Sequence, residues 1–263
     1  MSAQAATIES IYRYPVKGLS PERMAEVDLE VGQPLPGDRQ YAIENGPSGF
    51  DPAAPSYLPK TKFLMLMRNE RLAALHTRYD ADRHLLSITR DGAEAVRGDL
   101  QSRDGRQAIE TFFSENFQPE LHGPPRVLQS EGHSFSDVAK KVVSIINLAS
   151  VAALAEVIGR PVSPLRFRGN LHVTGWPAWH EFALMGQTLS IGSARLKVVK
   201  RIVRCAATNV DPDTAARDMT IPHTLMQTYG HADCGIYAEV VAAGTIADGD
   251  RILSDQYQLD GIT

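Results

Sequence analysis

Short runs of alternating apolar and polar residues, separated by glycine and proline turns, constrain this chain more than any other feature. Such runs occur at Thr7–Tyr14, Glu26–Val31, Gln40–Glu44, Ala73–Tyr79 and Leu85–Ile88. Alternation with period two is typical of half-buried β-strands. The close spacing of the runs favours strands that follow one another directly over alternating strand and helix units. We therefore predict a mainly β (α+β) fold.

Two segments have the longer period of a helix. Residues Arg106–Phe117 carry apolar side chains at helical spacing, and residues 147–159 form an apolar run with Asn147 as a candidate N-cap and Gly159 at its end. Pro119–Pro125 interrupts the chain between them. We place a domain boundary there and predict two parts, residues 1–122 and 123–263.

Net charge and hydropathy limit the general partners of this chain. A net charge of −4 and a sequence pI near 6.1 give no overall attraction to nucleic acid or to an anionic membrane. No apolar run approaches the roughly 18 residues that span a bilayer, and the N-terminus lacks the pattern of a signal peptide. We expect a cytoplasmic protein that binds neither nucleic acid nor membrane.

The cysteines limit the metal chemistry. The chain has two, Cys205 and Cys234, in no C-x-x-C pair, so we expect neither a usual zinc site nor an all-cysteine iron–sulfur cluster. Cys234 precedes an apolar strand, and we expect it to pack rather than react. The nucleotide-binding patterns G-x-G-x-x-G and G-x-x-x-x-G-K do not occur, which argues against a dinucleotide or nucleotide enzyme.

Cys205 stands where a strand ends. The apolar run Leu196–Val203 reads as a strand and the Asp-Pro pair at 211–212 as a turn, which places the thiol between them. We expect Arg201 and Arg204 to bring positive charge to the sulfur and to favour the thiolate, the form that attacks electrophiles and binds metals. The residues alone leave a buried structural cysteine as an equal alternative.

Several basic and polar residues are candidates for an anion site. Lys17 lies on a loop at the end of the first strand, and Arg39 opens a strand after a Gly-Asp turn. Arg168 and Asn170 are predicted to share one face of a short strand at 165–173. Ser150 would lie in the first turn of the second helix, where free N–H groups favour anions. Each feature alone is more often an ordinary solvated or structural one.

Two segments are predicted to be irregular. Residues 45–60 are rich in proline and read as a surface loop that could form a lid, and residues 213–227 are polar. If the protein receives electrons from a partner, segments 45–60 and 213–233 are the candidate docking rim.

Five short motifs in a fixed order carry a family resemblance: Tyr-Pro-Val-Lys at 14–17, Gly-Asp-Arg at 37–39, Phe-Arg-Gly-Asn at 167–170, Arg-Cys at 204–205 and Val-Asp-Pro at 210–212. With these, the chain resembles the MOSC domain family and its N-terminal partner domain. In motif order it is similar to the mitochondrial amidoxime reducing component and to bacterial reductases of N-hydroxylated compounds. The resemblance implies two β-barrel-like parts, an N-terminal MOSC-associated barrel (1–122) and a MOSC domain (123–263), with the site in the cleft between them.

The resemblance also implies a molybdenum cofactor (molybdopterin) and no pyridoxal phosphate or haem. By matched positions Cys205 is the metal ligand and catalytic residue. The cofactor-binding residues implied are Lys17, Arg39, Ser150, Arg168, Asn170 and Thr208. Departures from the family pattern occur at Gly18, where Ser is common, and at Asn209 and Ala215, where Thr and Gly are usual.

The implied reaction is the reduction of a small N-hydroxylated compound by removal of its oxygen at molybdenum. Some bacterial relatives append a ferredoxin-like domain, whereas this chain ends soon after the MOSC unit. We therefore expect a separate protein donor of the ferredoxin or cytochrome b5 type to supply the electrons. The alternative is a sulfur-carrier or cofactor-delivery protein that bears a persulfide on Cys205.

Overall fold

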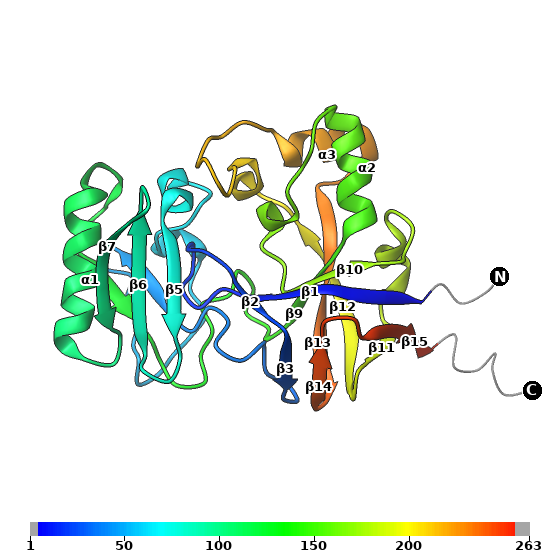
Figure 1. The fold of residues 1–263 in the computed structure, drawn as a ribbon, viewed down its shortest axis with the longest axis horizontal. Helices are drawn as coiled ribbons and strands as arrows, with labels where there is room; N and C mark the ends of the chain where they lie inside the picture. The colour runs from blue at the N-terminus through cyan, green and yellow to red at the C-terminus, as the bar shows by residue number, and fades with distance from the viewer. Residues whose placement is uncertain (1–4, 256–263) are drawn as a thin grey trace, which may run out of the picture.

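The structure, a computed structural model, describes residues 5–255 and is mainly β, as predicted (Figure 1). Seven strands form a closed barrel in the order β1, β10, β9, β13, β12, β11, β15 and back to β1. Neighbours in the ring are antiparallel except β9 and β10. The barrel strands are β1 (Ala6–Arg13), β9 (Val143–Asn147), β10 (Leu171–Thr174), β11 (Thr188–Ile191), β12 (Ala194–Val203), β13 (Asp233–Ala242) and β15 (Arg251–Ser254).

The start of the chain is built into this barrel. In β1, Ile8 pairs with Val173 of β10, and Ala6 pairs with Ile252 of β15. Strand β2 (Glu22–Met24) pairs antiparallel with the end of β1, and β3 (Glu26–Leu29) pairs with β14 (Gly244–Ala247). Strand pairing therefore joins residues on both sides of position 122, where we expected the domain boundary, and it connects residues 6–29 to the last part of the chain.

The rest of the N-terminal sequence forms small sheets with their own core. Strands β5 (His76–Asp80), β6 (Leu85–Arg90) and β7 (Ala93–Asp99) make a meander, and β4 (Ala42–Asn45) pairs with β8 (Pro125–Leu128). Helix α1 (Arg103–Asn116) packs against β7 at one end of the molecule (Figure 1). Its phenylalanines fill that core, as the helical spacing predicted.

Two further helices lie beside the barrel (Figure 1). Helix α2 (Leu148–Ile158) begins at Asn147, whose side chain accepts from the Ala149 N–H, and ends at Gly159 with a left-handed φ of 78°, so both predicted caps are confirmed. Helix α3 (Ile221–Tyr229) was not predicted, because its segment reads as polar. It buries Ile221 and Leu225 against α2 and the barrel. Among residues 5–255, no helix is long and apolar enough to cross a membrane.

The strand predicted at 165–173 is shorter than expected. A 3-10 helix occupies Pro164–Phe167, Arg168 adopts a left-handed φ of 51°, and β10 begins only at Leu171. Gly169 passes so close to Ile146 that a Cβ at this position would lie 2.2 Å from the Ile146 side chain. Arg168 therefore points from a turn, and it does not share a strand face with Asn170.

Candidate functional site

A cavity of about 270 Å³ lies between the barrel and the N-terminal sheets and is lined by residues from both. Most charged residues in its lining are basic, although the whole protein has a net negative charge. The acidic lining residues are Asp38 and Asp137; the basic ones are Lys17, Arg39, Lys60, Arg166, Arg168, Lys200, Arg201 and Arg204. A wall with this composition favours an anionic ligand.

Cys205 opens onto this cavity from the end of a strand, as the sequence predicted. Strand β12 ends at Val203, and a 3-10 helix, Ala206–Asn209, starts directly after the cysteine. The carbonyl of Cys205 accepts hydrogen bonds from the Thr208 N–H (3.1 Å) and hydroxyl (3.0 Å), which fix the turn. The thiol is partly exposed, and Thr208 also lines the cavity.

The cation beside the sulfur is Lys60, a residue that the sequence analysis did not single out. Its Nζ lies 3.2 Å from Cys205 Sγ and 3.6 Å from the Asp137 carboxylate. Burial lowers the pKa of Lys60, but its interactions with Asp137 and the Cys205 sulfur outweigh burial and raise the pKa above its ordinary value. No local pattern could have revealed this contact, because 145 positions separate the two residues.

The two arginines expected beside the sulfur are engaged elsewhere. The Arg204 guanidinium donates to the carbonyls of Cys234 (2.7 Å) and Phe167 (2.9 Å). Arg201 stacks over the Phe182 ring at 4.3 Å. Both still line the cavity, so they add to its positive charge while Lys60 makes the direct contact with Cys205.

Lys17 and Asp137 form an ion pair in the cavity wall. The Lys17 ammonium also donates to the Phe135 carbonyl at 2.8 Å, and its side chain is 6% exposed. Burial lowers the pKa of Lys17, against the opposing effect of Asp137. Burial disfavours the charged form of Asp137 too, but Lys17, Lys60 and Arg39 together hold its pKa well below the usual range.

Arg39 and Arg168 meet over the ring of Tyr14. Their guanidinium carbons lie 4.6 and 4.2 Å from the ring centroid, and Arg39 pairs with Asp38 while it donates to the Arg168 carbonyl at 2.9 Å. Arg168 Nη1 donates to the Leu19 carbonyl at 2.8 Å, but its buried Nη2 has no hydrogen-bond partner among the described residues. Burial lowers the pKa of Arg168 to about 10. Within residues 5–255 no carboxylate forms an ion pair with Arg168, although buried charges are usually paired.

Asn170 reaches the cavity, whereas Ser150 does not. The Asn170 Oδ1 accepts from the Ser144 hydroxyl at 2.7 Å, and the residue also lines the cavity. Ser150 is fully buried; its hydroxyl donates to the Glu181 carboxylate at 2.9 Å and accepts from the Trp179 N–H at 2.8 Å. Ser150 is therefore not among the residues that line the cavity, and its hydroxyl joins α2 to Glu181 and Trp179.

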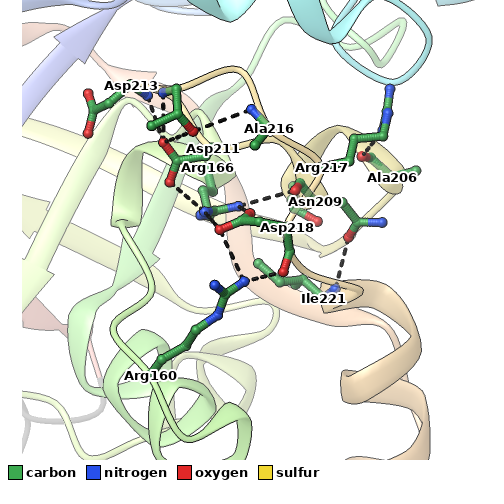
Figure 2. Close-up of polar contacts among 12 residues, drawn as sticks. Arg160, Arg166, Ala206, Asn209, Asp211, Asp213, Ala216, Arg217, Asp218 and Ile221 are labelled. Carbon is green, nitrogen blue, oxygen red and sulfur yellow. Dashed lines mark hydrogen bonds and ion pairs between the residues drawn. The ribbon is translucent and has the colours of Figure 1, made fainter.

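The loop after Cys205 is held by a buried ion-pair network (Figure 2). Arg166, whose side chain is 1% exposed, lies 2.6 Å from Asp211 and 2.9 Å from Asp218. Asp218 also pairs with Arg160 at 3.0 Å. The loop keeps a glycine-like turn at Ala215, with φ of 61°. The network explains the Val-Asp-Pro motif, since Asp211 joins the loop to the segment that carries Arg168.

Arg217 links this loop to the opposite wall. Its guanidinium donates to the carbonyls of Ala206 (3.0 Å), Leu66 (2.9 Å) and Met67 (2.8 Å), and it pairs with Glu70 at 3.1 Å. Leu66 and Met67 line the cavity from the N-terminal side. Arg217 therefore sets the separation of the two walls beside Cys205, a role that sequence spacing did not reveal.

The two thiols are expected to differ sharply in reactivity. Burial raises the pKa of Cys234 to about 12. The thiol of an unfolded chain ionises near pH 8.5, below the pKa of the folded site, so the free energy of unfolding falls as the pH rises above about 9. At lower pH the folded protein keeps Cys234 protonated. Treatment with iodoacetamide at about pH 8, followed by mass spectrometry, should label Cys205 and leave Cys234 unmodified. Labelling of both residues at equal rates would contradict the assigned burial.

Comparison with known proteins gives two family matches and several distant relatives. The family described as MOSC domain matches residues 119–253, and the MOSC N-terminal beta barrel domain matches residues 5–123. The chain is 31% identical to bovine mitochondrial amidoxime reducing component 2 over 42% of its length and 36% of that protein. It is 23% identical to human mitochondrial amidoxime-reducing component 1 over 95% of this chain and 83% of that one. The crystal structure of the YuaD protein from Bacillus subtilis is similar, at 15% identity and a TM-score of 0.46, over 95% of both chains.

Proposed function

Because the chain belongs to the MOSC domain family and carries the MOSC N-terminal barrel before it, we propose that it reduces N-hydroxylated compounds with a molybdenum cofactor. One observation supports this most directly: a partly exposed thiol and a cluster of cations from distant parts of the chain line a single cavity. Relatives named amidoxime reducing components share up to 31% identity with it.

The residues present fit such a cofactor. Its phosphate needs buried donors, and Lys17, Arg39 and Arg168 provide them in one wall, with the free Nη2 of Arg168 still lacking an acceptor. Its metal needs a soft ligand, which the thiolate of Cys205 supplies. Asn170 and Thr208 complete the proposed set, from which we omit Ser150 because it lies outside the cavity.

When bound, the cofactor supplies the two-electron chemistry that removes oxygen from the substrate nitrogen. The chain's own residues hold and surround it. Lys60 keeps a positive charge beside the sulfur of Cys205, and the apolar side chains of Met65, Leu66 and Met67 in the cavity wall offer a surface to the substrate's carbon skeleton. Arg217 holds this wall against the cysteine loop.

Reduction of benzamidoxime to benzamidine tests the proposal. The holoprotein should catalyse it with a reduced viologen, or with NADH plus a ferredoxin or cytochrome b5 type donor and its reductase. NADH alone should give no turnover, since the chain has no dinucleotide fingerprint and two cysteines only. Turnover with NADH and the purified chain alone would contradict the electron route. A lack of turnover with every donor, despite a full complement of molybdenum, would refute the reductase.

The contact of Lys60 Nζ with Cys205 Sγ at 3.2 Å also suits a second function. An ammonium ion there would stabilise a persulfide anion as well as a thiolate, as a sulfur-carrier or cofactor-delivery protein requires. Analysis of the purified protein separates the two. Near-stoichiometric molybdenum supports the reductase, whereas sulfane sulfur on Cys205 without metal supports the carrier.

Removal of the Arg168 charge is expected to weaken cofactor retention. A charge-assisted hydrogen bond to phosphate contributes roughly 1.5–3 kcal/mol, so Arg168→Met should raise the cofactor's dissociation constant about tenfold or more. Arg97→Met is the matched control, because Arg97 is 66% exposed and is not among the residues that line the cavity. Molybdenum and pterin content after gel filtration provides the measurement. Equal retention by the two variants would exclude Arg168 from the phosphate site.

A further inference from the structure

One carboxylate in the cavity occupies a position suited to a ligand's anion. Asp137 contacts the ammonium groups of Lys17 and Lys60, which come from different segments of the N-terminal part. Both lysines line the cavity together with Arg39. Asp137 thus provides negative charge to the same cations that a phosphate group would use.

The other acidic residue of the wall has a different environment. Asp38 is buried, with a side chain 4% exposed, and it accepts from the Tyr14 N–H at 2.8 Å while it pairs with Arg39. Asp137 keeps a side chain that is 48% exposed, and it lies in the segment 129–142, which contains no helix or strand. Among residues 5–255, its carboxylate pairs with Lys17 and Lys60. Asp38 is part of the scaffold, whereas the Asp137 carboxylate is accessible and can be replaced.

We propose that Asp137 sets the affinity of this site by competing with the phosphate of a phosphate-monoester ligand for Lys17 and Lys60. The inference rests on the proposed function and deepens it. A phosphate that reaches Lys17 either displaces the Asp137 carboxylate or lies next to it. If the two anions lie next to each other, their like charges repel. In both cases Asp137 weakens binding.

The competition also reaches the thiol. Lys60 is shared, with its Nζ 3.6 Å from Asp137 and 3.2 Å from Cys205 Sγ. When a phosphate takes the place of the Asp137 carboxylate, the Lys60 ammonium exchanges one anionic partner for another. It stays next to the Cys205 sulfur. Through Lys60, replacement of Asp137 by a phosphate thereby changes the electrostatic surroundings of the Cys205 sulfur.

Calorimetric titration with inorganic phosphate tests the inference on the full chain, purified from cells that do not make the cofactor. Asp137→Asn removes the charge and keeps the shape, so the dissociation constant for phosphate should fall about tenfold or more. Asp82→Asn makes the same change in net charge at an exposed turn outside the cavity and should leave the constant unchanged. Lys17→Met added to Asp137→Asn should abolish the gain.

Unchanged or weaker phosphate binding by Asp137→Asn would overturn the inference, and would show that Asp137 orients Lys17 instead of competing. Undetectable binding by both the parent and this variant would overturn it as well. If Asp137→Asn does not fold, Asp137→Ser carries the same expectation. No turnover is measured, so the two proposals fail separately: a protein that reduces benzamidoxime but shows no gain in this variant keeps its proposed function and loses this role of Asp137.

Discussion

Replacement of Cys205 by serine is expected to abolish molybdenum retention and benzamidoxime reduction in a protein that still folds. The side chain is partly exposed, and its sulfur contacts the Lys60 ammonium, so little packing is lost. A hydroxyl oxygen is a poor substitute for a thiolate as a soft ligand. Metal analysis, a viologen-driven assay and the thermal unfolding midpoint together provide the measurement.

Cys234→Ser is the matched control for this prediction. Cys234 is fully buried in the cluster between α2, α3 and the barrel. Its replacement buries a hydroxyl and should cost about 1–3 kcal/mol of stability, while molybdenum content and turnover stay at the parent level. Loss of metal in both variants, or in neither, would remove the assignment of Cys205 as the ligand.

Arg166→Met is expected to lower the free energy of unfolding by about 3 kcal/mol, because it leaves two carboxylates without their shared buried partner. Arg166 alone bridges Asp211 and Asp218 in Figure 2, and its guanidinium also donates to the Asn209 carbonyl at 3.2 Å. Urea unfolding monitored by circular dichroism gives the free energy. Since this network holds the loop after Cys205, iodoacetamide labelling of Cys205 should change in the same variant.

Arg160→Met separates the buried network from an ordinary surface pair. Arg160 is 45% exposed, and its partner Asp218 keeps Arg166 when Arg160 is removed. The expected loss is therefore about 1 kcal/mol or less. Equal destabilisation by the two substitutions would mean that burial of Arg166 contributes nothing beyond a surface ion pair.

Local sequence patterns predicted an element correctly where residues within a few positions determine where it begins and ends. The caps of α2 at Asn147 and Gly159 were predicted and observed, because capping depends on side chains within a few positions of the helix end. The pattern failed at Arg168, where a turn replaces the predicted strand. There a 3-10 helix, Pro164–Phe167, ends at Arg168, and the next residue, Gly169, packs against Ile146, which lies 23 positions away in the sequence.

The sequence by itself determined the mainly β fold, the place of Cys205 at a strand end and the family, since alternation, turns and ordered motifs are properties of adjacent residues. Only the tertiary structure decided which side chains meet there. It brought Lys60 to the sulfur, left Arg204 to donate to carbonyls and turned the Ser150 hydroxyl to Glu181. Such contacts follow from the closure of the barrel and the packing of the N-terminal sheets against it. They join residues that are far apart in the chain, and no local pattern encodes them.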